Sequence, residues 1–378
     1  MNFYSNIPAE SYPFIFYNLV IILVISTALT KFLSVDNSIL YARKNIPIAL
    51  ILFSVFLILF LGLRPIDSWI FGDTPYYKHS FLNVFLQYEA IDWNEEWIWH
   101  NFNFFCNSVL NLSAEDFILL IEFLSITSIA FVCWKFFPNN TWIAILFFVA
   151  SFSFWGGAVN GIRNNLACCL VLVGLSLLLD KKNIIKLLSL LFFILALGIH
   201  RSTMLPILCA LFAYFINKEP KYAMFIWFAS IILSLIFNNL FAEMFAELGI
   251  DERLEDYLAN AGNSKVMNQF SNSGFRFDFL LYSAMPLLFV WYLTIKRNFK
   301  DNIYNIIATT YILSNSFWIL VIRASFSNRF AGLSWFLYPL VIVYPLLKME
   351  IWDNQDKATA IILFCYGGFT YFMYLLTL

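Results

Sequence analysis

Five arginines stand at the ends of long apolar segments, and they are the residues best suited to chemistry in this chain. They are Arg64, Arg163, Arg276, Arg323 and Arg329. A lone guanidinium costs about 2.5–3.5 kcal/mol at the centre of a membrane, so a partner or a ligand should compensate it. Arginine also presents a flat fork of donors that matches phosphate or carboxylate oxygens in pairs. The arginines predict an anion-binding cavity; the alternative is that each one anchors its helix or pairs with a nearby acid.

Two motifs place arginine where an anion would bind. NGIRNNLA at 160–167 puts Arg163 in the first turn of an expected helix. The positive end of the helix dipole and the guanidinium then favour the same anion. In VIRASFSNRFAGLSW at 321–335, a short turn is bracketed by Arg323 and Arg329. Two guanidiniums on either side of one turn can bind a diphosphate together.

Two further motifs lie at expected helix ends. In GFRFDFLLY at 274–282, the simplest interpretation of Arg276 and Asp278 is an ion pair that caps a helix. GIHRS at 198–202 places His200 at the end of an apolar segment and next to an arginine. A lone histidine is often structural, but a neighbouring cation favours the neutral imidazole, which could accept a proton.

An early loop, residues 64–115, carries acids among aromatic residues. A Gly-Asp turn presents Asp73 just before Tyr76 and Tyr77, and Glu96 precedes a tryptophan-rich stretch. Carboxylates accept from sugar hydroxyls and aromatic faces pack on pyranose rings, so the loop suits a sugar site. The alternative is the interfacial aromatic belt of any membrane protein. A second long loop, 241–277, begins with an acidic amphipathic stretch and predicts a surface helix over 241–258.

These residues are positioned by a chain that is 61% hydrophobic and 12% charged, against about 25% charged in an average soluble domain. Segments this long and apolar must be helices, because backbone groups cannot stay unpaired in lipid. We expect an all-α polytopic transmembrane bundle of about twelve spans that forms a single transmembrane domain over residues 1–378, with 64–115 and 241–277 as outer loops carrying short interfacial helices. The expected spans are 14–33, 46–63, 116–137, 140–157, 160–179, 184–200, 203–217, 222–240, 278–295, 303–322, 329–347 and 358–377.

The two sides of this bundle differ in the kind of basic residue. Taking alternate connections, one side holds 14 of the 23 basic residues, of which 12 are lysine, and the other holds 9, of which 7 are arginine. The lysine-rich side is expected to be cytoplasmic, which places the arginines outside. A net charge of −1 argues against a nucleic-acid partner. The six cysteines lack metal or disulfide spacing, so neither a metal site nor a disulfide framework is expected. No cofactor is expected either.

The order of motifs resembles a known family. GLR followed by GD..YY, then IRN.LA, H-x-S, FR.DFL and the late Arg329 resemble the EpsG-like branch of the Wzy-type polysaccharide polymerases. The resemblance implies a metal-independent, GT-C-like glycosyl transfer on the outer face of the bacterial cytoplasmic (inner) membrane. It implies an undecaprenyl-diphosphate-linked glycan as donor, a lipid-linked repeat unit as acceptor, surrounding membrane lipid, and a chain-length regulator protein as a further partner. The glutamine usual after the arginine of IRN.LA is Asn164 here.

The resemblance also implies roles for the candidate residues. Three groups compete to be the base that deprotonates the acceptor hydroxyl, and His200 is preferred over Asp73 and Glu96. The diphosphate is assigned to Arg163, Arg276, Arg329, Arg323 and Arg64. Sugar binding is assigned to Tyr76, Tyr77, Trp97 and Asp278.

Two other functions stay open at this stage. An O-antigen ligase uses the same donor, but such enzymes carry their key basic residues in a long outer loop late in the chain. Here the early 64–115 loop carries a comparable share of the candidate residues. A transporter or flippase for an anionic lipid or sugar would be expected to show internal repeats or matched broken spans. Neither is clear in the sequence.

Overall fold

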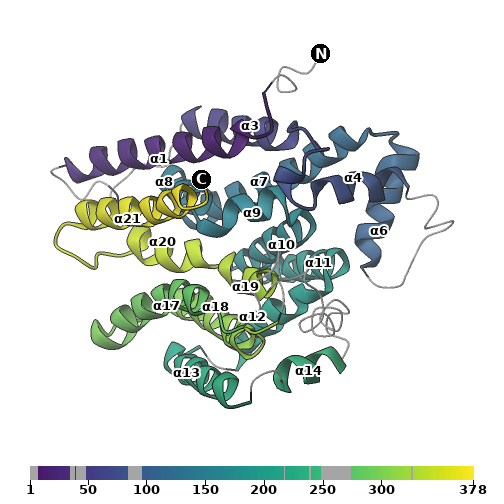
Figure 1. Ribbon diagram of the computed structural model, residues 1–378. Coiled ribbons are helices and arrows are strands. Elements are labelled where there is room, and N and C mark those ends of the chain that lie inside the picture. Colours follow the sequence, from purple (N-terminus) through teal and green to yellow (C-terminus); the bar gives the residue numbers. More distant parts are fainter. Residues whose placement is uncertain are drawn as a thin grey trace. The chain divides into compact units, whose positions relative to one another are not determined.

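Every regular element in the described part of the chain is a helix, which confirms the expected all-α class (Figure 1). The computed structural model describes residues 7–34, 39, 48–83, 96–216, 218–237, 240–247, 274–324 and 327–378.

Six of the described helices are long and apolar enough to cross a membrane, so the chain is a multi-pass membrane protein. They are α1 (Ser11–Phe32), α7 (Ala114–Phe136), α13 (Pro220–Phe237), α17 (Phe277–Trp291) continued by η5 (Tyr292–Lys296), α19 (Ser327–Trp335) with α20 (Tyr338–Lys348), and α21 (Gln355–Leu375).

Further apolar helices are shorter than a full crossing. They are α3 (Ile48–Gly62), α10 (Ile162–Leu178), α11 (Asn183–Ile199) and η4 (Arg201–Thr203) with α12 (Met204–Phe215). The helix α18 (Asn302–Leu320) has 19 residues but is not among the six candidate spans. The expected count of twelve spans therefore stays a prediction.

One expected span, 140–157, is wrong as a continuous helix. The chain there forms α8 (Thr141–Val149) and α9 (Phe152–Val159), which are bent by 72° relative to each other. The break falls at Ser151, whose backbone is extended and whose hydroxyl lies 3.0 Å from that of Ser153. Serine hydroxyls that bond locally compete with the helical ladder, which explains a break here. Two residues, Asn160 and Gly161, then separate α9 from α10.

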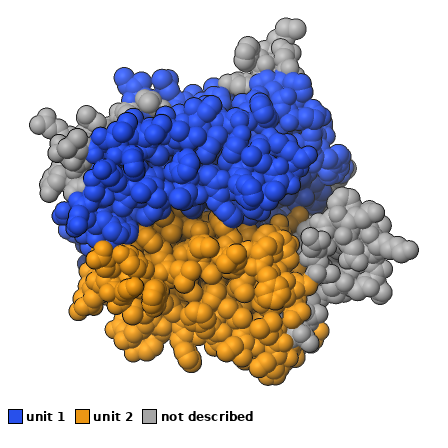
Figure 2. Space-filling view, turned by 60° about the vertical axis from the view of Figure 1, so that its left-hand side comes forward, with its two compact units in different colours: residues 1–200, 343–378 blue, residues 201–342 orange. Residues whose placement is uncertain are grey.

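The chain forms two compact units, residues 1–200 with 343–378 and residues 201–342 (Figure 2). The expectation of a single transmembrane domain stays a prediction. In the first unit, α1 and α21 lie side by side although they come from opposite ends of the chain (Figure 1). Tyr17 and Tyr374 stack between these two helices, with ring centroids 4.3 Å apart.

The early loop of the first unit contains short helices, as expected. They are η2 (Trp69–Phe71), α4 (Thr74–Leu82), α6 (Trp97–Phe104) and the π-helical turn η3 (Phe105–Val109). In the second unit, α14 (Leu240–Glu247) coincides with the start of the predicted surface helix over 241–258. The remainder of that prediction falls at 248–258, outside the described residues.

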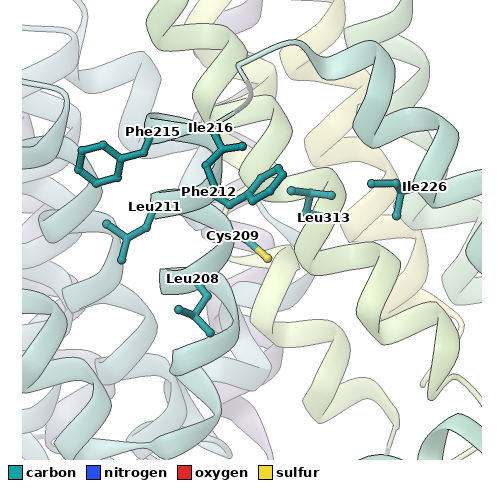
Figure 3. Close-up of a pocket in the computed structure, with 8 residues that line it drawn as sticks. All are labelled: Leu208, Cys209, Leu211, Phe212, Phe215, Ile216, Ile226 and Leu313. Carbon is teal, nitrogen blue, oxygen red and sulfur yellow. The ribbon is translucent and has the colours of Figure 1, made fainter.

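Some buried polar side chains of the second unit bond to one another, which satisfies them away from water. Trp227 on α13 donates to Asn315 on α18 at 2.7 Å, and Asn315 donates to Ser334 on α19 at 2.9 Å. A pocket of about 640 Å³ lies between α12, Ile226 of α13 and Leu313 of α18 (Figure 3). Its lining is apolar apart from the Cys209 thiol and offers no group suited to a phosphate or a sugar, so the candidate site must be sought elsewhere.

In the first unit, α3 and α7 approach each other closely at Gly62. A Cβ atom on Gly62 would lie 2.8 Å from the backbone Cα of Leu119. This approach brings Arg64, two residues past the end of α3, to Glu122 inside α7, where Nη1 and Oε1 are 3.0 Å apart. Both side chains are almost completely buried.

We expect Gly62→Ala to destabilise the protein by about 1–3 kcal/mol, because the added methyl group would push the α3 and α7 backbones apart. The matched control is Gly368→Ala in α21, where a Cβ atom meets nothing within 4 Å. Melting temperatures of the purified variants in detergent measure the difference. Equal melting temperatures for the two variants would contradict the close approach.

Candidate functional site

The centre of the candidate site is Glu96, which contacts two other candidate residues of the first unit. One carboxylate oxygen, Oε2, forms an ion pair with Nη1 of Arg163. The other, Oε1, lies 3.0 Å from Nδ1 of His200. Residues considered separately in the sequence therefore form one constellation.

Each of the three residues stands where a helix begins or ends. Arg163 is the second residue of α10, whose N-cap, Gly161, supplies no side-chain hydrogen bond to the first turn. His200 follows the last residue of α11 in an extended conformation. Glu96 precedes α6 with a φ of 49°. A non-glycine residue in the left-handed region is held there by its surroundings, and such residues cluster at functional sites.

The charges in this constellation compensate one another. Arg163 and His200 are only 7% and 8% exposed. Burial alone would raise the pKa of Glu96, but the contact with His200 and the charge of Arg163 prevail and hold this pKa below its usual value of 4.5. Glu96 is therefore an ionised carboxylate at neutral pH. Such a partner orients an imidazole and leaves the far ring nitrogen, Nε2, to exchange a proton.

Arg163 keeps donor capacity in this arrangement. The guanidinium has five N–H donors, and its buried Nε has no hydrogen-bond partner among the described residues. The uncapped N–H groups of the first turn of α10 lie next to it. A helix N-terminus combined with a guanidinium is a setting that favours a phosphate group.

Asp73 lies at the same corner of the first unit. Its backbone N–H donates to Oδ1 of Asn160 at 2.8 Å, and Asn160 is three residues before Arg163. Gly72 makes this contact possible, because its φ is +61° and a Cβ atom there would lie 2.2 Å from Oδ1 of Asn160. The Gly-Asp turn of the early loop is therefore fixed beside the start of α10.

The predicted sugar-binding aromatics differ in their surroundings. Tyr77 is partly buried against Trp99, with ring centroids 5.9 Å apart in an edge-to-face arrangement. The same apolar core includes the neighbours of two site residues, Ile162 and Ile199. Tyr76 is 63% exposed, and Trp97 is half-buried at the start of α6. Their role in sugar binding stays a prediction.

Arg64 is placed differently from its expected role. Its guanidinium is fully buried, pairs with Glu122 and donates to the hydroxyl of Thr74 at 3.0 Å and to the carbonyl of Leu61. These partners satisfy the alternative that an arginine at a span end pairs with a nearby acid. We therefore leave Arg64 out of the diphosphate site proposed below.

The other three arginines belong to the second unit. Arg276 holds Asp278 in a two-point ion pair, with Nε–Oδ1 and Nη2–Oδ2 distances of 2.9 and 2.6 Å. The guanidinium of Arg323 lies over the ring of Phe275, 5.4 Å from its centroid, so these two segments meet. Arg329 is partly buried in the first turn of α19.

Three residues with clear contacts were not singled out from the sequence. They are Glu122, Thr74 and Asn160. Glu122 had a recognisable signal, because an acid inside an apolar span is rare and marks a buried partner. Thr74 and Asn160 are common polar residues in loops, and only the fold shows what they contact.

Together, the fold and the site define a multi-pass helical membrane protein with a buried acid, imidazole and guanidinium at helix ends. A model of the EpsG family matches residues 47–378. The chain belongs to the EpsG family, which confirms the resemblance seen in its motifs. Membership indicates a membrane protein of polysaccharide biosynthesis, a glycosyltransferase-like enzyme, and lipid-linked saccharide substrates. A search of the curated proteins gave no match, and neither did a search of the solved structures.

The lowered pKa of Glu96 makes a prediction about stability and pH. The carboxylate contributes stability above its unfolded pKa, and this contribution is lost as the pH falls through the lowered folded value. We expect the wild type to melt at a higher temperature than Glu96→Gln at about pH 7 and still at about pH 4.5, with the gap closing only in more acidic buffer. Melting curves in detergent across this range measure it.

The control is Asp67→Asn, which removes an exposed carboxylate that pairs with Lys78. An exposed pair contributes little, so this variant should follow the wild type at every pH. A Glu96→Gln gap that has already closed at about pH 6 would show that the partners do not hold the carboxylate ionised.

Proposed function

We propose that this protein polymerises lipid-linked oligosaccharide repeat units by glycosyl transfer on the outer face of the bacterial cytoplasmic membrane. The donor is a glycan on undecaprenyl diphosphate and the acceptor is a lipid-linked repeat unit. The observation that carries the proposal is the constellation of Arg163, Glu96 and His200 at the ends of three helices. The arginine-rich set of connections supports the outer side.

The constellation can act on both the acceptor hydroxyl and the donor diphosphate. The acceptor hydroxyl gives its proton to Nε2 of His200, while Glu96 orients the ring and stabilises the imidazolium that forms. The hydroxyl oxygen forms a bond to the anomeric carbon of the donor sugar, and the bond from that carbon to the diphosphate oxygen breaks. Asp73 is the second candidate for the base and stands at the same corner.

The diphosphate leaves with developing negative charge. Arg163 and the first turn of α10 are already in place to receive it, and such preorganised donors stabilise a transition state without reorganisation. Diphosphate binding by Arg276, Arg323 and Arg329, which belong to the second unit, stays a prediction from the sequence. Guanidiniums then supply the positive charge that a metal ion provides in other glycosyltransferases, and the proposed reaction needs neither metal nor cofactor.

Sugar binding is proposed for aromatic residues of the early loop and, separately, for Asp278 in the second unit. Tyr76, Tyr77 and Trp97 offer ring faces and Asp278 offers a carboxylate. The lipid tails remain in the surrounding membrane. A chain-length regulator protein is a further proposed partner.

The proposal is tested with a strain that lacks the gene and carries either the wild type or Arg163→Ala. Wild type should restore a ladder of polymer lengths on a gel of surface polysaccharide, and Arg163→Ala should leave single-repeat glycans. Arg163→Lys keeps the charge but loses the fork, so we expect chain growth to fall by about tenfold or more. Arg297→Ala is the matched control, because Arg297 is an exposed arginine on the lysine-rich side.

Protein levels in membranes show whether each variant is present. A normal ladder from well-expressed Arg163→Ala would remove that residue from the site. If deletion instead leads to long lipid-linked polymer that never reaches a final acceptor, the protein is a ligase. If repeat units remain on the inner leaflet, it is a transporter.

A further inference from the structure

A chain of buried polar groups runs from the middle of α7 to the corner that carries the candidate site. Glu122 contacts Arg64 at 3.0 Å, Arg64 donates from Nη2 to the hydroxyl of Thr74 at 3.0 Å, and Thr74 donates to the carbonyl of Val159 at 2.6 Å. The three side chains are each at most 2% exposed. This buried relay therefore joins α7, the end of α3, the start of α4 and the end of α9.

The last link of the relay lies beside the proposed reaction site. Thr74 directly follows Asp73, and Val159 directly precedes Asn160. The two corners are joined twice, by the hydrogen bond of Thr74 to Val159 and by that of the Asp73 N–H to Asn160. Arg163 is four residues past Val159, so both contacts fix the early loop against the segment that begins α10.

The relay leaves the Thr74 hydroxyl only one orientation. A hydroxyl has a single proton, and here its oxygen accepts from Arg64 while that proton is directed to the Val159 carbonyl. Glu122 compensates the charge that Arg64 brings into the span. Buried ion pairs are often no more stabilising than apolar residues of the same size, so stability alone does not account for this one.

We infer that Thr74, held by Arg64 and Glu122, is a positioning residue that fixes Asp73 relative to Arg163. It acts on glycosyl transfer without touching the substrate. The inference rests on the proposed function and assigns Arg64 to positioning and not to the diphosphate. A displacement of about 1 Å in such a site can lower a rate by about a hundredfold.

The test compares Thr74→Val with Thr74→Ser in the purified protein, with a lipid-diphosphate-linked repeat unit as substrate. Valine keeps the shape and removes both hydrogen bonds, whereas serine keeps the hydroxyl. We expect Thr74→Val to lower kcat by about ten- to a hundredfold with little change in KM, and Thr74→Ser to retain kcat within about threefold. Melting temperatures of both variants are measured alongside.

A mutant cycle with Asp73→Asn separates positioning from a general loss of stability. If Thr74 acts through Asp73, the double variant is no slower than Asp73→Asn alone, because the misplaced group is already gone. Independent effects that multiply would overturn the inference. Asn160→Ala removes the second contact at a half-buried position, and it should show the same loss of kcat and the same dependence on Asp73.

Three further outcomes overturn the inference and leave the proposed function intact. The first is a kcat for Thr74→Val equal to that of wild type. The second, which applies if Thr74→Val does not fold, is a wild-type kcat for Asn160→Ala. The third is an equal loss of kcat for Thr74→Val and Thr74→Ser. In each case Arg163→Ala remains inactive while wild type forms polymer. Failure of the wild type to extend the substrate would instead contradict the proposed function itself.

Discussion

In the described part of the first unit, each buried arginine must be paired with a carboxylate, because an uncompensated charge is unfavourable inside an apolar protein. A buried guanidinium is tolerated only with a carboxylate and hydrogen-bond partners close by. The chain meets this requirement twice, with Glu122 for Arg64 and with Glu96 for Arg163. The two pairs differ in their surroundings. Arg64 also donates to the Thr74 hydroxyl and the Leu61 carbonyl, whereas Arg163 shares Glu96 with His200 and stands in the uncapped first turn of α10.

Interruptions of helices create the places where these charges meet. After the break at Ser151, α9 ends at Val159 and α10 begins at Ile162, so Asn160 and Gly161 lie between two helices. The positive φ of Gly72 allows the early loop to lie against that corner. Uninterrupted spans would have paired these backbone groups within each helix and kept the side chains apart. Irregular backbone is tolerated here because it is packed inside protein.

Much of the fold could be predicted from the sequence because apolar segments of this length permit little except helices. The ends of α1, α7 and α21 lie within a few residues of the expected ones. The break inside 140–157 was missed, because hydropathy averages over a window and does not register two serines. In the site, the residue types identify Arg163, Glu96 and His200 as candidates. They do not predict that the three side chains contact one another. Their contact joins positions 67 and 104 residues apart from Glu96, and only folding brings such positions together. The sequence leaves open whether Arg64 binds a ligand or pairs with an acid, and the fold supplies Glu122 as its acidic partner.

The most direct test of the central claim is chain growth by the purified protein in liposomes. The substrate is a lipid-diphosphate-linked repeat unit, supplied without nucleotide and with excess EDTA. The account predicts a ladder of lipid-linked oligomers from wild type and none from the His200→Ala variant, with release of free lipid diphosphate at each addition. Wild-type protein that moves the substrate across the bilayer without joining units, or that grows chains only after a metal ion is restored, would contradict it.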